Sequence, residues 1–366
     1  MKVALIHDWL TGMRGGEKVL EVFCELFPDA SLFTLVHRKG TVSPTIEALR
    51  PTTSFLQRLP GGVRHYRYFL PLMPTAVECL DVTGFDLVLS SSHCVAKGII
   101  PGPGARHVSY THSPMRYIWD LWPRYFGTDS LRGKLMQPTL TRLRAWDVAA
   151  SARVDHFIAN SQFVSGRIER YYRRSSEIIQ PPVDVERFDI DSPPGEDYLM
   201  VSALVPSKGL ELALDTFREL DRPLRIVGVG PLEKELRERA GRRTTFLGWL
   251  SEEALRDEYA RAKAVVHTAV EDFGIVALEA AAAGRPVIAL GQGGSLETVA
   301  PLGGDRPPTG ILFEEPTVGD LRRAVQTLEA ERGQFDPGAL KAHAAPFHRD
   351  RFRARITAAL ERELQG

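Results

Sequence analysis

Two carboxylates in one short stretch of the sequence have surroundings that suit ligand binding. Glu271 and Glu279 are eight residues apart, and Gly274 lies between them at the expected junction of a loop and a helix. The residues from 275 to 283 are almost all apolar helix formers, which predicts a buried helix. A carboxylate that is buried without a partner costs several kcal/mol, so Glu279 must meet a polar group.

The start of this predicted helix suits a phosphate group. The first turn of a helix presents free N–H groups and the positive end of the helix dipole. We therefore interpret the stretch as a nucleotide-sugar site, with a phosphate near Gly274, one glutamate facing the sugar and the other on the ribose hydroxyls. The alternative is a core helix whose glutamate pairs with a nearby arginine, because structural ion pairs also bury carboxylates. The helix alone leaves both interpretations open.

The elements that position this stretch alternate between strands and helices. Short apolar segments predict buried strands, and helical segments follow most of them. This order implies right-handed crossovers and parallel sheets. The segments expected as strands are 3–6, 85–90, 107–110, 154–159, 177–180, 199–202, 224–227, 245–247, 264–267, 287–290 and 310–313.

A length of 366 residues exceeds what one hydrophobic core usually supports, so two domains are expected. The polar, proline-rich stretch 190–197 has the composition of a linker. We predict an N-terminal acceptor-binding domain over residues 1–190 and a C-terminal donor-binding domain over residues 191–346. Residues 347–366 are expected as a helix that packs back on the N-terminal domain, although packing on the C-terminal domain alone is the alternative. The apolar residues that recur there at helical spacing are Phe352, Ile356, Ala359, Leu360 and Leu364.

Other candidate contact residues come just after predicted strands. Gly15 and Gly16 follow the first strand, where they would let the backbone approach a phosphate or sugar closely, or simply form a tight connection. His112 lies at the strand edge where open α/β sheets bind ligands, but a lone histidine is usually structural. In the second half, the residues that follow strands are Lys208, Gly228, Gly230, Trp249 and Leu250.

Two stretches, residues 52–75 and 115–145, interleave basic and aromatic side chains. This mixture suits an acceptor-facing surface or a peripheral contact with a membrane. The alternative is that both stretches form helices packed on their own domain, with the charges in solvent. The candidate acceptor contacts selected from these stretches are Arg64, Arg116 and Tyr117.

The composition argues against several functional classes. Lys plus Arg and Asp plus Glu both number 46, so no net charge indicates a nucleic-acid partner. No apolar run is long enough to span a membrane, and the apolar start of the chain is too short for a signal peptide. The three cysteines lack metal-type spacing and fit a reducing compartment. We expect a cytoplasmic protein, either free or at the inner face of the membrane.

With these residues placed, the chain resembles the GT-B glycosyltransferases of family 4, a large retaining group, over essentially its whole length. Glu271 and Glu279 resemble the signature of that family, and residues 284–288 and 293–297 resemble the segments that follow the signature. Lys208-Gly209 is similar to its diphosphate-binding motif, Gly15-Gly16 to its N-terminal glycine loop and His112 to its histidine beside the C6 of the sugar. Residues 3–21 and 90–119 look closer to a bacterial subgroup that makes surface polysaccharides, often mannosyltransferases.

The resemblance implies an α/β protein of GT-B fold, with two Rossmann-like parallel-sheet domains facing across a cleft. It also implies retaining transfer of a hexose, with mannose from GDP-mannose favoured, from a nucleoside-diphosphate sugar to a hydroxyl of a glycan or lipid-linked saccharide in cell-surface polysaccharide synthesis. The leaving phosphate would take the acceptor proton, and neither a cofactor nor a metal is expected. The implied catalytic residues are Glu271, His112 and Lys208. The implied donor-binding residues are Gly15, Gly16, Lys208, Gly228, Gly230, Trp249, Leu250, Glu271, Phe273, Gly274, Ile275 and Glu279.

One position departs from the family pattern. The family usually carries an arginine five residues before the lysine, and this chain has Ala203 there. Lys208 would then have less help in neutralising a diphosphate, unless Arg14, Arg116 or Arg285 replaces the missing charge. Three alternatives stay open: a nucleotide-sugar epimerase of the same fold, a non-catalytic sugar-nucleotide-binding subunit, and a nicotinamide oxidoreductase. The oxidoreductase is disfavoured because Glu233 occupies the third glycine position of its fingerprint.

Overall fold

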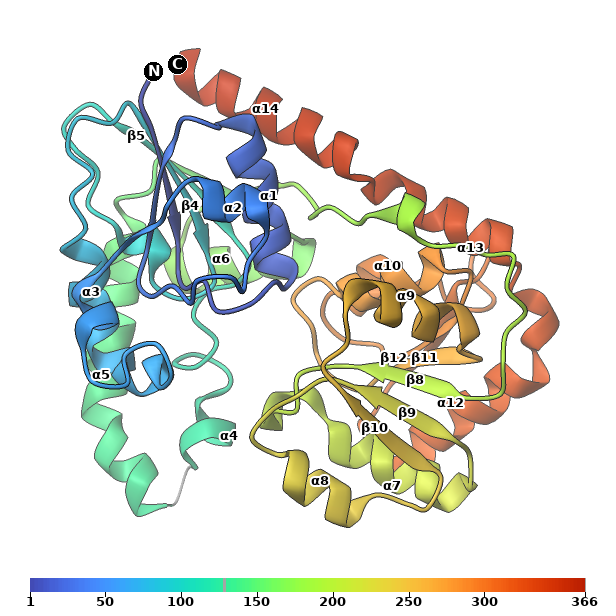
Figure 1. Ribbon diagram of the computed structural model, residues 1–366. Coiled ribbons are helices and arrows are strands. Elements are labelled where there is room, and N and C mark those ends of the chain that lie inside the picture. Colours follow the sequence, from blue (N-terminus) through green and yellow to red (C-terminus); the bar gives the residue numbers. More distant parts are fainter. Residues whose placement is uncertain (128–129, 366) are drawn as a thin grey trace. The chain divides into compact units, whose positions relative to one another are not determined.

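The computed structural model describes residues 1–127 and 130–365, and the chain divides into two compact units. Unit 1 consists of residues 1–182 and 352–366, and unit 2 consists of residues 183–351 (Figure 1). Both units are built from parallel strands joined by helices, as the alternating sequence pattern predicts.

Unit 1 contains, within the described residues, one parallel sheet of seven strands in the order β3-β2-β1-β4-β5-β6-β7. The strands are β1 (Val3–His7), β2 (Ser31–Thr34), β3 (Thr52–Thr53), β4 (Leu87–Ser92), β5 (Arg106–Thr111), β6 (His156–Ala159) and β7 (Glu177–Ile178). The helices are α1 (Gly15–Leu26), α2 (Pro44–Ala48), α3 (Met73–Glu78), α4 (Trp122–Phe126), α5 (Leu131–Ser151), α6 (Gln162–Tyr172) and α14 (Arg349–Gln365).

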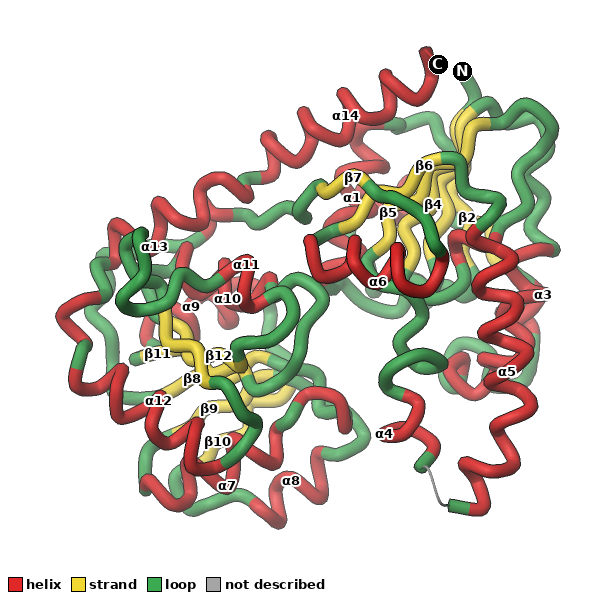
Figure 2. The backbone as a smooth tube through the Cα atoms, turned by 180° about the vertical axis from the view of Figure 1, so that it is seen from behind, coloured by secondary structure: helices red, strands yellow, loops and turns green. Residues whose placement is uncertain are grey.

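The central strand β1 sends alternate side chains into two separate cores. Val3 and Leu5 join a cluster that includes residues of α1 and α14, whereas Ala4 and Ile6 join a cluster that includes residues of α3 and α5. Helices therefore cover both faces of the sheet, as parallel sheets require. The ribbon and the view from behind show the two layers (Figures 1 and 2).

Unit 2 contains, among the described residues, a parallel sheet of six strands in the order β10-β9-β8-β11-β12-β13, with one continuous hydrophobic core. The strands are β8 (Tyr198–Val201), β9 (Leu224–Val227), β10 (Thr244–Gly248), β11 (Ala264–His267), β12 (Val287–Leu290) and β13 (Gly310–Phe313). The helices are α7 (Leu210–Leu220), α8 (Glu233–Arg239), α9 (Glu252–Arg261), α10 (Ile275–Ala282), α11 (Ser295–Thr298), α12 (Val318–Ala330) and α13 (Pro337–Ala344).

The division between the units falls earlier than the linker composition predicts. Unit 2 begins at Val183, eight residues before the expected start at 191. Val183, Val185 and Phe188 are buried in the core of unit 2, so this stretch is held by packing and is not a free linker. The proline-rich residues 191–194 form an exposed, irregular lead into β8 within the same unit.

The C-terminal helix α14 belongs mainly to unit 1. It begins at Arg349, two residues later than expected, and Gly366 lies outside the described residues. Phe352 stacks on Phe23 of α1 and meets Tyr110 of β5 edge-on, at ring separations of 6.2 and 5.7 Å. The buried residues of the helix are Phe352, Ile356, Ala359 and Leu360, the face that the spacing indicates, whereas Leu364 is 40% exposed.

Candidate active site

The loops that follow the strands of unit 2 carry most of the residues selected from the sequence. Because the strands are parallel, these loops all leave the same edge of the sheet, where α/β proteins bind ligands. The turn η5 (Pro206–Lys208) follows β8, residues 228–230 follow β9, Trp249 and Leu250 follow β10, and residues 268–274 follow β11.

Lys208 and Glu271 meet at this edge as an ion pair. Lys208 Nζ donates to Glu271 Oε1 at 2.5 Å, and His267 Nε2 lies 3.4 Å from the same oxygen. Burial raises the pKa of Glu271, but the charge of Lys208 and the contact with His267 outweigh burial and hold that pKa below the ordinary value of a glutamate. Glu271 is therefore an anion at neutral pH, and Lys208 is the cation beside it.

Glu279 finds its polar partner in a helix that the sequence analysis did not connect with it. The hydroxyl of the buried Tyr259, on α9, donates to Glu279 Oε2 at 2.9 Å. Glu279 lies in the middle of α10, and only 8% of it is exposed. Burial, and then the charge of Glu279, raise the pKa of Tyr259 well above the usual value, so the phenol keeps its proton and remains a donor. The carboxylate is thus held in a fixed orientation.

Helix α10 starts at a left-handed glycine. Gly274 has φ +93°, and a Cβ atom there would lie 3.0 Å from Thr298 Oγ1. The neighbouring Phe273 is buried, with its ring 5.8 Å from that of Phe347, so its side chain is not available to a ligand. Ile275 is half-buried in the first turn. The loop after β11 carries Glu271 and leads directly into this turn, so α10 starts at the same edge of the sheet as Glu271.

Gly228 and Gly230 are required by the packing of two loops. A Cβ atom would come within 1.9 Å of the Ser202 carbonyl oxygen at Gly228 and within 2.3 Å of the Leu204 carbonyl oxygen at Gly230. Because glycine has no Cβ atom, the loop after β9 can lie against the loop after β8, which carries Lys208. Their assignment as donor-binding residues stays a prediction.

Trp249 is a large aromatic side chain that the rest of unit 2 leaves exposed. It is 76% exposed at the end of β10, and Leu250 beside it is half-buried. An exposed indole of this kind offers a flat surface to an aromatic ring. The assignment of both residues as donor-binding residues stays a prediction.

In unit 1, Gly16 and His112 lie together at the carboxyl edge of the sheet. A Cβ atom on Gly16 would be 3.6 Å from both His112 Nε2 and His7 Cε1, while Gly15 has open space around it. Ser91 Oγ bonds His112 Nε2 at 2.9 Å and His7 Nδ1 at 3.1 Å. Burial, followed by the charges of His93 and His7, lowers the pKa of His112 well below the usual value, so this imidazole is neutral near pH 7.

Asp8 fixes the loop that brings His93 to this edge. The Asp8 carboxylate accepts the backbone N–H groups of four successive residues, 93 to 96, at 2.6 to 2.9 Å. Its Oδ2 also lies 3.2 Å from His93 Nδ1. His7, Asp8 and His93 were not selected from the sequence, because their proximity to His112 depends on the pairing of β1, β4 and β5.

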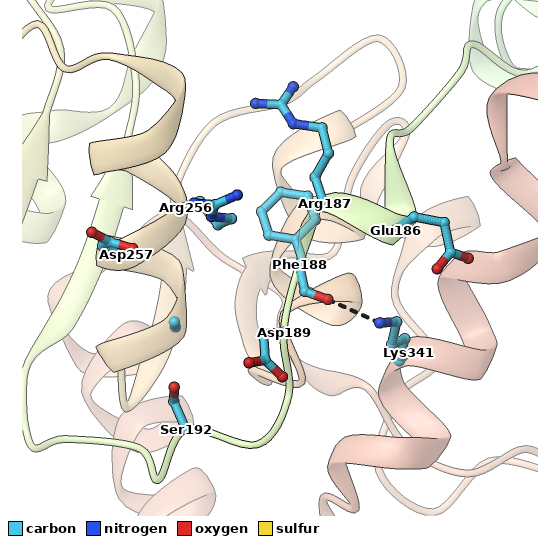
Figure 3. Close-up of a pocket in the computed structure, with 9 residues that line it drawn as sticks. Glu186, Arg187, Phe188, Asp189, Ser192, Arg256, Asp257 and Lys341 are labelled. Atoms are coloured by element: carbon cyan, nitrogen blue, oxygen red, sulfur yellow. Dashed lines mark hydrogen bonds between the residues drawn. The ribbon is translucent and has the colours of Figure 1, made fainter.

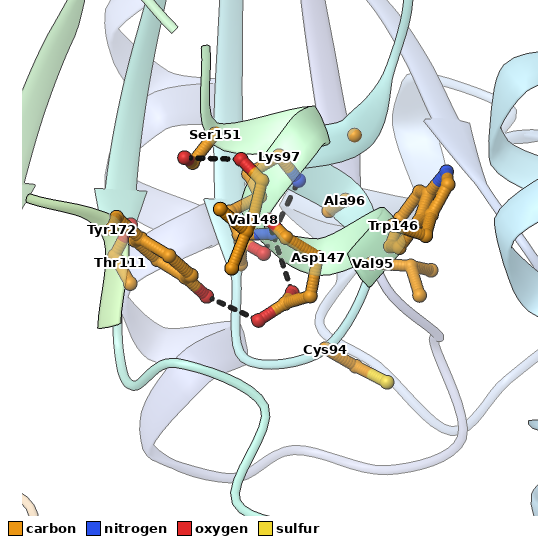
Figure 4. Close-up of polar contacts among 12 residues, drawn as sticks. Cys94, Val95, Ala96, Lys97, Thr111, Trp146, Asp147, Val148, Ser151 and Tyr172 are labelled. Carbon is orange, nitrogen blue, oxygen red and sulfur yellow. Dashed lines mark hydrogen bonds and ion pairs between the residues drawn. The ribbon is translucent and has the colours of Figure 1, made fainter. Parts of the chain in front are cut away.

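A buried ion pair holds the other end of the same loop (Figure 4). Lys97 Nζ donates to Asp147 Oδ1 at 2.6 Å, and Asp147 Oδ2 accepts hydrogen bonds from Trp119 and Tyr172. Both charged side chains are almost completely buried. Because every charge here is matched by a partner, this centre is structural and ties α5 to the loop after β4.

The three arginines considered as replacements for the missing charge at position 203 differ in their surroundings. Arg285 is buried and donates to the main-chain oxygens of Ala260 and Ser192, so it is committed to structure and the expectation that it could serve is wrong. Arg116 pairs with Asp120 at 3.3 Å. Arg14 is exposed at the N-terminus of α1.

The two basic-aromatic stretches are partly buried and partly exposed. Residues 52–75 form no single helix but the turns η1 (Phe55–Arg58) and η2 (Tyr66–Leu72) before α3, with Arg64 exposed between them. In 115–145, residues 128 and 129 lie outside the described part of the chain, and Tyr117 packs edge-on against Tyr125 at 5.4 Å. The large apolar side chains left exposed in these stretches are Phe55, Tyr68, Leu72, Leu131 and Leu135.

A separate pocket of about 530 Å³ lies elsewhere in unit 2 (Figure 3). Acidic and basic side chains line it in mixture, and Lys341 bridges it by donating to the Phe188 carbonyl oxygen at 2.9 Å. None of the selected site residues line this pocket, so we do not place the active site there. Its lining residues are Glu186, Arg187, Phe188, Asp189, Ser192, Arg256, Asp257, Ala260 and Lys341.

Two features are absent from the described residues. Residues 1–127 and 130–365 contain no group of three or more His, Cys, Asp or Glu side chains placed to hold a metal ion. The helices in the same ranges are all too short or too polar to cross a bilayer.

Comparison with solved structures defines the class of fold. The chain matches HepE from Anabaena in complex with UDP and glucose with a TM-score of 0.71 at 18% identity, over 99% of both chains. Sucrose-phosphate synthase from Thermosynechococcus elongatus gives the same TM-score and identity over 99% of both chains. The protein therefore has the GT-B fold of two parallel-sheet α/β domains.

Family models then match each half of the chain. Residues 33–187 match the model "Glycosyltransferase Family 4", and residues 184–339 match the model "Glycosyl transferases group 1". The two matches meet within a few residues of the division between the units.

Curated relatives are similar over part of the chain. O-antigen chain mannosyltransferase C of Escherichia coli is 31% identical over 42% of this chain. A GDP-mannose-dependent alpha-(1-6)-phosphatidylinositol monomannoside mannosyltransferase of Mycobacterium tuberculosis is 32% identical over 43% of it. The matches span 45% and 48% of those proteins, so the chain spans about half the length of the curated relatives it matches.

Proposed function

We propose that this protein is a retaining glycosyltransferase that moves a hexose from a nucleoside-diphosphate sugar to a hydroxyl acceptor. The observation that carries the proposal is the Lys208–Glu271 ion pair beside the start of α10, within the segment that matches the glycosyl transferases group 1 model. A cation and a helix N-terminus suit a diphosphate, and a partly exposed carboxylate suits sugar hydroxyls.

The proposed chemistry is stabilisation of charge on the leaving group. Departure of the nucleoside diphosphate leaves a cation-like sugar and a growing negative charge on phosphate. In unit 2, Lys208 and the N–H groups after Gly274 would stabilise that charge as it develops. Glu271 would hold sugar hydroxyls, Glu279 the ribose, and Trp249 with Leu250 the base. In unit 1, the Gly15–Gly16 backbone and the neutral His112 are the proposed contacts to phosphate and sugar.

Mannose carried by GDP is the donor we favour, because two of the similar relatives are named as mannosyltransferases and one of those names specifies GDP-mannose. The acceptor we propose is a glycan or a lipid-linked saccharide of the cell surface, reached from the cytoplasmic side. Exposed Leu131 and Leu135 beside the basic Lys134 support a peripheral contact of unit 1 with a membrane.

Incubating the protein with a panel of nucleoside-diphosphate sugars, with and without lipid-linked acceptors, tests the proposal. We expect a glycosylated acceptor whose anomeric configuration, read by NMR, matches that of the donor. Release of free nucleoside diphosphate and an epimerised sugar without acceptor would identify an epimerase instead. Tight donor binding without turnover would indicate a non-catalytic subunit. This alternative is considered because Ala203 stands where the family usually has an arginine.

A further inference from the structure

His267 is a buried titratable side chain that the proposed chemistry does not use. It ends β11, its side chain is 7% exposed, and its Nε2 atom has no hydrogen-bond partner among the described residues. A buried polar atom left unpaired is unfavourable. The position of Nε2, 3.4 Å from Glu271 Oε1, therefore requires an explanation.

The oxygen that His267 approaches is already shared with Lys208. While Lys208 pairs with Glu271 at 2.5 Å, the ammonium group balances the charge of the carboxylate. The imidazole of His267 then needs no positive charge. Lys208 is the most exposed of the three, with 27% of its side chain accessible against 18% for Glu271. An anionic ligand would therefore reach Lys208 first.

Drawing Lys208 toward an anion would leave Glu271 mostly buried without a cation. Such an uncompensated carboxylate is strongly unfavourable in a protein interior. We propose that His267 takes up one proton from solvent when an anionic ligand engages Lys208, and that its imidazolium then replaces Lys208 as the counter-ion of Glu271. The proton returns to solvent when the ligand leaves, and no other bond changes. The identity of the anion rests on the proposed function, whereas the proton step belongs to these three side chains.

The elements around His267 bring few other charges. The loop after β11 carries Asp272 besides Glu271, and η5 carries Lys208. In β12 the residue paired with His267 is the uncharged Ala289, and the β8 residues paired with β11 are Tyr198 and Leu199. Helix α10, which follows, contributes Glu279, which bonds Tyr259. Glu271 is thus the charge that His267 contacts directly.

The first test needs no ligand. Lys208→Ala removes the ammonium, so His267 should bind a proton to compensate Glu271, and its ring resonances should titrate about one pH unit or more higher than in the natural protein. Because the imidazolium is stabilised only in the folded variant, this stabilisation is present at low pH and is lost as pH rises. The melting temperature of Lys208→Ala should accordingly fall between about pH 6 and about pH 8.

Three variants make the result specific. Lys208→Ala/His267→Gln should lose the pH-dependent part of the stability, and His267→Asn serves if the glutamine variant does not fold. Lys263→Ala removes another ion-paired lysine of unit 2, which contacts Glu196 and Glu329, and should leave the His267 titration unchanged. A His267 titration that is the same with and without Lys208 would overturn the proposal.

The second test uses GDP-mannose as the probe. Calorimetric titration in two buffers of different ionisation enthalpy should show uptake of about one proton per molecule bound above pH 7, and none with His267→Gln. If GDP-mannose binds neither protein while the His267 titration still shifts in Lys208→Ala, the donor assignment fails and the role of His267 stands. Binding without proton uptake in the natural protein would refute that role for this ligand.

Discussion

The two glutamates of the candidate site differ in what holds them, and this difference predicts different kinetics. Glu279 is fixed by Tyr259 inside α10, away from the reacting sugar in our assignment, while Glu271 lies next to Lys208. A ribose contact acts alike in ground and transition states, whereas a contact at the reacting centre changes during reaction. Glu279→Ala should raise the donor KM about tenfold or more, and Glu271→Ala should mainly lower kcat. Steady-state kinetics that change both constants equally in both variants would contradict the assignment.

Tyr259 should matter through its hydroxyl alone. Tyr259→Phe keeps the ring against Phe188, 5.5 Å away, but removes the hydroxyl that donates to Glu279. We expect a donor KM raised by about tenfold at unchanged kcat, since a hydrogen bond to a charged group contributes about 1.5–3 kcal/mol. Tyr198→Phe is the matched control, because it loses a similar bond to Glu329 in the same unit. An equal effect of both variants on KM would reduce Tyr259 to a structural residue.

Charge neutralisation by Lys208 and backbone N–H groups predicts that no divalent metal is needed. EDTA should leave most of the transferase activity intact, because the proposed stabilisation of the diphosphate comes from the protein itself. Activity measured with and without chelator checks this. Complete loss that magnesium or manganese restores would show that the protein supplies too little positive charge, as Ala203 in place of arginine would suggest.

At the scale of elements, the loops after β8 and β9 depend on close backbone contact. Gly228 has φ +141°, and Gly228→Ala would place Cβ 1.9 Å from the Ser202 carbonyl oxygen. We expect the free energy of unfolding of unit 2 to fall by about 3 kcal/mol, measured by urea denaturation. Gly248 also has a positive φ, +70°, but open space surrounds it, so Gly248→Ala introduces backbone strain without a steric overlap. This control should lower the free energy of unfolding by about 1 kcal/mol. Equal losses of unfolding free energy in the two variants would show that the loops move apart at little cost to accommodate the Cβ atom at position 228.

The sequence predicts those features of the structure that depend on neighbouring residues in the chain, but not those that depend on tertiary packing. The helix after Gly274 and the strands around it follow from apolar runs and glycine, and the structure has α10 and β12 at those places. The need of Glu279 for a polar partner was also predictable, but the partner was not, because Tyr259 comes from another helix and only tertiary packing brings it near.

The same limit explains why His7 and His93 were not selected from the sequence. They lie near His112 because three strand ends meet there, and nothing in the local sequence reveals that β1 pairs with β4 and β4 with β5. The division between the units was misplaced because Pro193-Pro194 has the composition of a linker while the residues that pack, such as Phe188, precede it. A polar, proline-rich composition predicts that a stretch is exposed. It does not predict to which of the two hydrophobic cores the neighbouring residues belong.

At the scale of the whole molecule, unit 1 is assembled from two distant parts of the chain. Phe352→Ala should lower the free energy of unfolding of unit 1 by about 3–5 kcal/mol, because the ring is buried against Phe23 and Tyr110. Leu364→Ala, on the same helix but 40% exposed, should change stability by less than about 1 kcal/mol. Chemical denaturation of both variants measures the difference, and similar losses would mean that α14 contributes little to the core of unit 1.

This discontinuous path also sets the order in which the units can be completed during synthesis. The residues of unit 2 are contiguous, so all of them have left the ribosome once Arg351 has emerged. Unit 1 begins first but lacks Phe352, Ile356 and Leu360 until these residues are translated, so the face of its sheet that α1 covers is incompletely packed for that time. Domains usually fold from the N-terminus onward during translation. In this chain the second unit is complete before the first.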